Sequence, residues 1–202
     1  MRYRWGAWIG VLIWIAAGPA RAAVPMFLPD HDIAGTYRLS QPGKPSTTWR
    51  VRYSAGAEIA RARSLDGAAA GTVILLNMRS RNAIIVLDQM HAVVAVPGVG
   101  AVLERVLTGD GAQFTPLGHA QIAGHECARY LVLKRGAAGS VCLTRHGVLL
   151  AGQGHDQQGA VRITALSVQD AVQPVGAFAP PPGYSQITLP PAMLAQLLGA
   201  SG

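Results

Sequence analysis

Few residues in this chain have the types and spacing that metal binding requires. His125-Glu126-Cys127 is similar to a fragment of a zinc motif, but position 129 is Arg, so the second His at the helical i+4 spacing is absent. A metal site could instead draw on two His and two Cys, namely His119, His125, Cys127 and Cys142. Because a disulfide would use the same two sulfurs, we expect no metal site.

Acid–base and nucleophilic chemistry have equally little support. Glu104 and Glu126 are the carboxylates nearest to expected packed elements, and no residue pairs with them for proton transfer. The chain has no Gly-x-Ser-x-Gly motif, and Gly98-Val99-Gly100 lacks the third Gly of a dinucleotide fingerprint. Asp30-His31-Asp32 could touch a cation, but we expect a solvated leader segment there. The sequence predicts no enzyme, no catalytic residues and no cofactor.

The N-terminus has the pattern of a secretory signal peptide. Two Arg lie within the first four residues, residues 8–17 are an apolar run, and Ala20-Arg21-Ala22 places small residues where a signal peptidase cleaves. A membrane anchor is the weaker alternative, because a spanning helix needs about 20 apolar residues. We expect cleavage after Ala22, giving a signal peptide over 1–22 and one periplasmic domain over 23–202.

The charge of the chain argues against nucleic acid as a partner. Loss of the three Arg of the signal lowers the formal net charge from +7 to +4. The remaining basic residues are scattered, and no aromatic stripe is interleaved with them. Transient contact with an anionic membrane surface or with envelope proteins stays open, and we expect a monomer.

Cys127 and Cys142 are the two cysteines of the chain. In an exported protein such a pair is more often a disulfide than a metal site. A simple hairpin that turns over residues 136–139 would not set the two residues directly opposite each other. We therefore expect a bulge or an irregular connection between them.

Short strand-like runs alternate with turn signals along most of the chain. In residues 47–54, Trp49, Val51 and Tyr53 share one face, which is the period of a strand with one solvated side. The expected strands are 35–40, 47–54, 58–63, 72–78, 82–88, 91–96, 113–117, 127–134, 140–144, 148–153 and 160–168.

Three of these runs, 72–78, 82–88 and 91–96, are apolar on both faces. Continuous apolar strands are usual in parallel sheets, but the connections here are too short for crossover helices. The strands must then be antiparallel neighbours whose two faces both need cover. Amphipathic helices expected over 97–107 and 190–198 could supply it, and so could a bound apolar ligand.

Several segments resemble the periplasmic lipoprotein-carrier superfamily, and an exported branch of it in particular. They are Asp32-Ile33, Tyr37-Arg38, the strand from Trp49 to Tyr53, the paired-Cys block 124–150 and the closing segment 178–184. The resemblance implies a mainly β fold, an open half-barrel of curved antiparallel sheet with helices over its concave apolar face. In the carriers that cavity holds acyl chains.

We therefore expect a binding or carrier protein for a lipid, acyl chain or other apolar ligand. The expected ligand-binding residues are Trp49, Val51, Tyr53, Leu75, Ile85, Leu87, Val94, Val102 and Val106. The alternative is an interaction or assembly module of the cell envelope whose core is closed by its own side chains.

Overall fold

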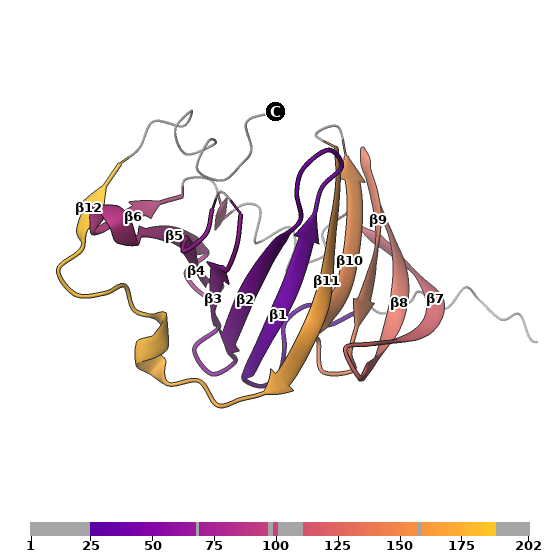
Figure 1. Cartoon of the computed structure of the whole chain (residues 1–202). Helices are drawn as coiled ribbons and strands as arrows, with labels where there is room; N and C mark the ends of the chain where they lie inside the picture. Colours follow the sequence, from indigo (N-terminus) through magenta and orange to yellow (C-terminus); the bar gives the residue numbers. More distant parts are fainter. Residues whose placement is uncertain (1–24, 68, 97–98, 101–110, 157–158, 189–202) are drawn as a thin grey trace, which may run out of the picture.

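The structure is a computed structural model that describes residues 25–67, 69–96, 99–100, 111–156 and 159–188. These residues form an open, curved sheet with almost no helix (Figure 1). The strands are β1 (Ile33–Ser40), β2 (Thr47–Ser54), β3 (Ile59–Ser64), β4 (Val73–Asn77), β5 (Asn82–Leu87), β6 (Ala92–Ala95), β7 (Gln113–Ile122), β8 (His125–Lys134), β9 (Ala137–Leu143), β10 (Leu149–Asp156), β11 (Gly159–Asp170) and β12 (Ser185–Ile187). Two short 3-10 turns, η1 (Asp88–Met90) and η2 (Val175–Phe178), lie between strands.

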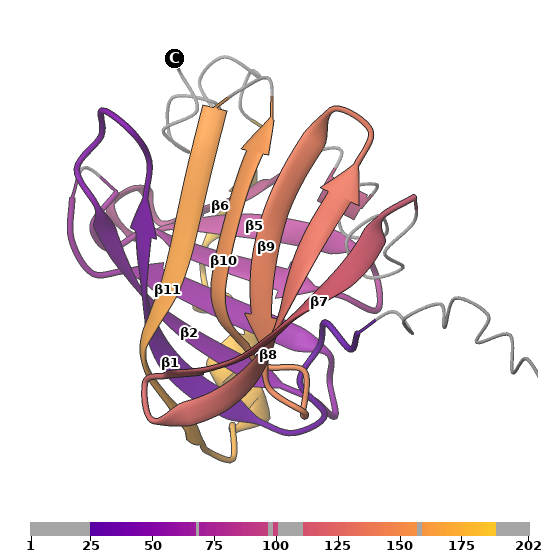
Figure 2. The same cartoon turned by 90° about the vertical axis from the view of Figure 1, so that its right-hand side faces the viewer.

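A single sheet contains all twelve of these strands, in the order β12-β6-β5-β4-β3-β2-β1-β11-β10-β9-β8-β7. Every neighbouring pair is antiparallel except β12 and β6, which run parallel. Successive hairpins place β2 to β6 on one side of β1 and β7 to β11 on the other (Figure 2). The expected curved antiparallel sheet is therefore confirmed.

The observed strands follow the sequence pattern closely in the first half of the chain, and residues 47–54 form β2 as expected. Later strands are longer than expected. β7 continues to Ile122, because a register shift between Pro116 and Gly118 lets its ladder with β8 resume. The β8–β9 hairpin turns at Arg135-Gly136, not over residues 136–139, since Lys134 already pairs with Ala137.

The disulfide between Cys127 and Cys142 is confirmed, with 5.3 Å between the two Cα atoms. The expected bulge between them is wrong, because the β8–β9 ladder runs without a register shift. Cys142 is paired with Arg129 across the ladder, and Cys127 lies two residues before Arg129 in β8, so the bond is diagonal. The register shift of this region lies instead between β9 and β10, at Leu149 and Ala151.

The apolar central strands are covered on both faces by protein side chains. Val73, Leu75 and Val86 form one buried cluster, against which Tyr184 packs. On the other face Ile85 and Val94 are 0% and 1% exposed, and Ile187 packs against them.

Part of this cover comes from residues 171–184, an irregular stretch that includes η2, and from β12, to which this stretch leads (Figure 1). The Arg61 guanidinium fixes η2 by donating a hydrogen bond to the Ala177 carbonyl over 2.8 Å. The helices expected over 97–107 and 190–198 lie outside the described residues, apart from Val99 and Gly100. No helix in the described part of the chain is long and apolar enough to cross a membrane.

Candidate functional site

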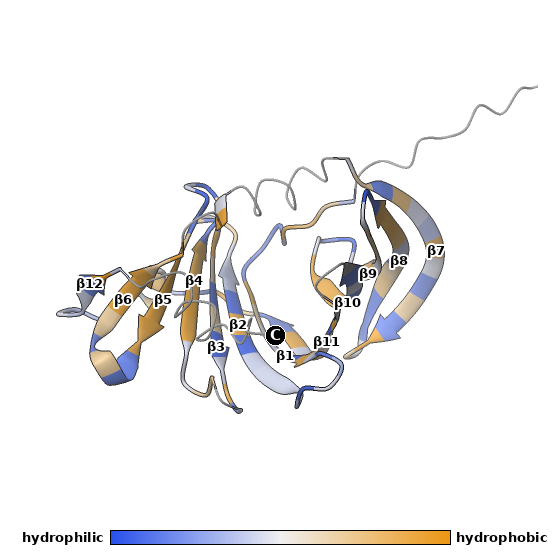
Figure 3. Ribbon diagram, turned by 90° about the horizontal axis from the view of Figure 1, so that it is seen from above, coloured by the Kyte–Doolittle hydropathy of each residue, from blue (hydrophilic) through white to orange (hydrophobic). Residues whose placement is uncertain are grey.

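The segment 25–32 lies inside the curve of the sheet, between its two halves (Figure 3). Leu28 packs against the main core cluster, and the rings of Phe27 and Phe114 are 5.3 Å apart between centroids. The N–H of Asp30 donates to the carbonyl of His146 over 3.1 Å, in the turn between β9 and β10. The segment is thus a folded part of the concave face, not the solvated leader that the sequence led us to expect.

Gly147 is the residue that permits this close approach. Its φ of +78° is a conformation that glycine adopts readily, and the backbone of Leu28 lies where a Cβ would be. A side chain at position 147 would therefore push the segment away from the sheet.

A cavity of about 790 Å³ opens between this segment and the strands β7 to β11. Its deep wall is apolar, because Leu143, Val148, Leu150 and the Cys127 half of the disulfide are all buried. The other lining residues, several of them polar, are Pro25, Met26, His31, His119, His125, Glu126, Ala128, Tyr130, Thr144, Arg145, His146, Val168 and Asp170. The arrangement suits a ligand with an apolar body and a polar end.

One wall of the cavity is closed by the tip of the β7–β8 hairpin. His125, the first residue of β8, contacts β11 through a hydrogen bond of 2.9 Å between its Nε2 atom and the Val168 carbonyl. Because a carbonyl only accepts, this bond places a proton on Nε2 of His125. The same residue was a candidate metal ligand, and with Nε2 bound to a backbone carbonyl only Nδ1 is left for other contacts.

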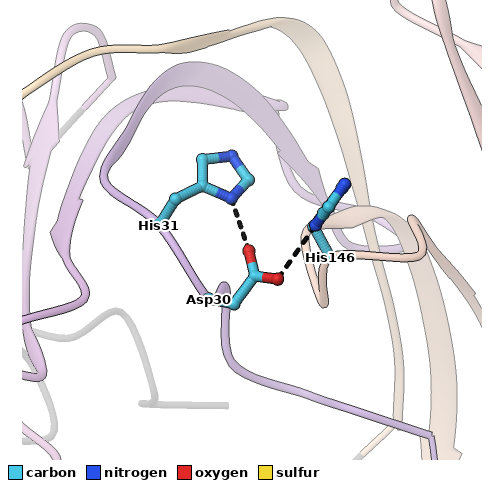
Figure 4. Close-up of side chains that lie close together, drawn as sticks. All are labelled: Asp30, His31 and His146. Carbon is cyan, nitrogen blue, oxygen red and sulfur yellow. Dashed lines mark hydrogen bonds and ion pairs between the residues drawn. The ribbon is translucent and has the colours of Figure 1, made fainter.

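A cluster of four side chains lies at the edge of the cavity, and Figure 4 shows three of them. The Asp30 carboxylate bridges two histidines, with 2.6 Å from Oδ1 to Nδ1 of His31 and 2.9 Å from Oδ2 to Nδ1 of His146. On its other side, Nε2 of His31 lies 2.9 Å from Oδ1 of Asp170. These contacts join the 25–32 segment to the β9–β10 turn and to the end of β11.

The cluster perturbs the ionisation of its members. The hydrogen bond to Asp30 raises the pKa of His31, with a further contribution from Asp170, although burial acts in the opposite direction. The hydrogen bonds from His146 and then His31 lower the pKa of Asp30. His31 therefore favours its charged form, in which both ring nitrogens donate to carboxylates.

Asp32 anchors the C-terminal end of the same segment through hydrogen bonds. Its two carboxylate oxygens accept the N–H groups of Ala55 and Gln173, each over 2.8 Å. These hydrogen bonds, that from Gln173 first, lower the pKa of Asp32. Asp32 thereby connects β1 to the β2–β3 turn and to the chain that follows β11.

The sequence-predicted site residues are distributed over both faces of the sheet. Cross-strand pairing puts Trp49, Val51 and Tyr53 on the same face as Ile85, Leu87 and Val94. Leu75 pairs with Arg61 and Ile84, so it lies on the opposite face. The prediction of one pocket shared by all of these residues is therefore wrong for Leu75, because one residue along a strand reverses the side-chain direction.

The remaining predicted residues have different surroundings. Val102 and Val106 lie outside the described residues. Ile85 and Val94 are fully packed, whereas Trp49, Val51 and Leu87 are half-buried. Among the predicted ligand-binding residues that the structure describes, none lines the cavity of about 790 Å³ or a second groove of about 710 Å³ between the β1–β2 turn and Leu117. Ligand binding by these residues stays a prediction.

Solved structures of other proteins have this fold. An uncharacterized conserved protein from Thermus thermophilus is 11% identical over 79% of this chain and 91% of its own, with a TM-score of 0.58. MucB is 16% identical over 81% of this chain and 64% of its own, with a TM-score of 0.54. In the complex of MucA and MucB from Pseudomonas aeruginosa the TM-score is 0.53, and the match covers 56% of that chain.

The likeness is one of fold alone. Matching structures also include a LolA superfamily protein from Nitrosomonas europaea, which is 10% identical over 76% of this chain and 92% of its own, with a TM-score of 0.42. Beyond this likeness in fold, the expected resemblance to the lipoprotein-carrier superfamily stays a prediction. The chain spans about three fifths of the length of the MucB chains that it matches. No family model and no curated protein sequence matches the chain.

Proposed function

We propose that this chain is an exported, non-enzymatic binding protein that holds the apolar part of a lipid or acyl chain in the cavity beneath residues 25–32. The observation that carries the proposal is that cavity. Its volume of about 790 Å³ falls within the range of about 300–1,000 Å³ that is usual for small-ligand sites. Its buried wall is apolar, and each methylene group buried there would contribute about 0.8 kcal/mol to binding.

The polar lining supports an amphipathic ligand over a plain hydrocarbon. Arg145 places positive charge near an apolar wall that contains Leu150. A carboxylate or phosphate head group would find donors there, while Asp170 and Glu126 disfavour additional negative charge. The proposed ligand is therefore a lipid or fatty acid with a small anionic or zwitterionic head group.

The test begins with the mature protein purified from the periplasm without detergent. Mass spectrometry of its organic extract is expected to find a co-purifying lipid, and a fluorescent fatty acid is expected to bind the delipidated protein at a saturable site. Ala128 lines the cavity, so Ala128→Phe should fill it and weaken probe binding at least tenfold. The matched control is Ala137→Phe, at an exposed position of β9.

Two results would contradict this proposal. One is the absence of both a co-purifying lipid and a saturable probe site. The other is unchanged probe binding by Ala128→Phe combined with loss of binding by Trp49→Ala, which would move the site to the residues predicted on β2.

A second candidate function is an interaction module of the cell envelope. It is favoured by the tight packing of Ile85 and Val94, which leaves the central strands without an opening at those positions, and by the fold likeness to MucB, which is solved in complex with MucA(peri). Crosslinking in living cells followed by mass spectrometry would test it. A single envelope protein captured in stoichiometric amount, by a chain that binds no lipid, would support this function over the carrier.

A further inference from the structure

Three side chains at the edge of the cavity meet as potential ligands of one ion. Asp30, His31 and His146 each offer one ligand atom, and all these atoms lie within 4.8 Å of one another (Figure 4). Asp30 and His31 are adjacent in the chain, whereas His146 is 116 residues away from Asp30. The β9–β10 turn supplies this third residue, and the hydrogen bond from the Asp30 N–H to the His146 carbonyl aligns the two segments.

We propose that Asp30, His31 and His146 form a binding site for a divalent first-row transition metal ion such as zinc. Imidazole nitrogen and carboxylate oxygen are a ligand set that zinc accepts. Bonds of about 2.0–2.1 Å in tetrahedral geometry set ligand atoms roughly 3.3 Å apart. Oδ1 of Asp30 lies 2.6 Å from Nδ1 of His31 and Oδ2 lies 2.9 Å from Nδ1 of His146, so the side chains must shift together for one Asp30 oxygen and both nitrogens to reach that separation.

Asp170 adds an independent feature of metal sites. Metal-bound histidines usually donate their second ring N–H to a carboxylate, which fixes the ring and its tautomer. Here Nε2 of His31 lies 2.9 Å from Oδ1 of Asp170, so Nδ1, which faces Asp30, is the nitrogen left for the ion, and it must release its proton when the ion binds. Asp170 is thus a positioning residue for His31, and it comes from the far end of β11.

Arg145 opposes metal binding in this arrangement and gives the proposal a sharp test. Its Nε donates to Nε2 of His146 over 2.7 Å, which leaves the ring proton on Nδ1, the atom that would bind the ion. Binding therefore requires the proton to move to Nε2 and the guanidinium to turn away. Arg145 is exposed and free to rotate into solvent, so its removal should strengthen metal binding.

The consequence for the molecule is a metal bridge between the 25–32 segment and the β9–β10 turn. His31 and His146 both line the cavity, so the ion would hold residues 25–32, which cover the cavity, in place. The site does not depend on the proposed lipid, because its ligands are complete without one.

The experiment is isothermal titration of zinc alone into the mature chain, without a polyhistidine tag and after treatment with a chelator. One saturable ion per chain is expected. His146→Ala and His31→Ala should each weaken binding at least tenfold, and Asp170→Asn about ten- to a hundredfold. Arg145→Ala should tighten binding several-fold.

Two histidine variants serve as controls. His119→Ala lies in the same cavity and His155→Ala in β10, both at exposed positions, and zinc affinity should be unchanged in each. Circular dichroism establishes that every variant is folded, and Arg145→Ala changes only an exposed side chain, so its effect on affinity can be measured even if a histidine variant fails to fold. The absence of a saturable site in the parent chain, unchanged affinity in His146→Ala, or weaker binding in Arg145→Ala would each overturn the proposal.

Discussion

Gly147 lies directly against the backbone of Leu28, so the turn between β9 and β10 and the segment that covers the cavity are packed without space for a methyl group. The two residues are far apart in sequence and neither belongs to a strand, since Leu28 precedes β1 and Gly147 lies in the turn between β9 and β10. Their contact determines how tightly residues 25–32 close over the concave face.

Gly147→Ala should release this contact. A non-glycine residue at φ +78° costs roughly 1–2 kcal/mol, and the collision with Leu28 adds to that cost. We expect a loss of unfolding free energy above 2 kcal/mol in urea, together with faster hydrogen exchange in residues 25–32. Gly136→Ala is the matched control, since Gly136 has φ +76° and nothing lies within 4 Å of its added Cβ. Equal losses of unfolding free energy in the two variants would show that the collision with Leu28 adds nothing to the cost of Gly147→Ala.

Removal of the disulfide should destabilise the fold without changing its topology. The bond joins residues 15 apart in sequence, and closing a loop of that length stabilises a protein by about 3 kcal/mol on the chain-entropy model. Cys127→Ser should lower the free energy of unfolding by a similar amount under oxidising conditions. Under reducing conditions the parent and the variant should differ little. Free-thiol titration of the native protein checks the premise, which is wrong if both thiols react.

Tyr37 should make the protein sensitive to alkali. Burial raises the pKa of Tyr37 from 10.0 to about 12, so the folded state favours the neutral phenol. Because the folded pKa exceeds the unfolded one, this contribution is fully present below pH 10 and is lost as pH rises through about 12. Its size is roughly 2–3 kcal/mol, from a shift of about two pKa units.

Urea unfolding between about pH 8 and pH 12 measures this effect, since that range spans both pKa values of Tyr37. Tyr37→Phe should lose less stability than the parent over that range, since it has no phenol to ionise. Identical slopes for the two proteins would contradict the assignment to Tyr37.

Asp32 should stabilise the protein through its two backbone hydrogen bonds. Asp32→Ala leaves the N–H groups of Ala55 and Gln173 without their acceptor, and we expect a loss of about 1–3 kcal/mol. The pKa of Asp32 is lowered in the fold, so its contribution is present above the unfolded value of 3.8 and disappears as pH falls through the folded value. Acid unfolding followed by fluorescence should be less steep in the variant than in the parent.

Local features of the chain were predictable because they depend on neighbouring residues. The alternation of Trp49, Val51 and Tyr53 places β2 at the observed residues, and the short connections between apolar runs require antiparallel neighbours. The pairing of Cys127 with Cys142 follows from their number and from the expected export. Strand ends were less predictable where a register shift lets a strand pass Pro116, because tertiary pairing there outweighs local propensity.

The candidate site was not predictable in this way. Asp30-His31 is a visible pair in the sequence, but no periodicity connects it with His146 or Asp170. These residues meet for two reasons. β11 pairs with β1, so Asp170 lies opposite Ile33 at the start of β1, where it contacts His31. The β9–β10 turn faces the same edge of the curve, which brings His146 to Asp30.

The sequence by itself therefore determined the strand pattern, the mainly antiparallel sheet and the disulfide, since each arises from alternation, turn length or residue type. Only the tertiary structure decided which face each apolar residue occupies, where the cavity opens and which charged groups surround it. The physical reason is that a one-residue change of register reverses every side chain in a strand, and the curvature that closes the cavity arises from the whole sheet.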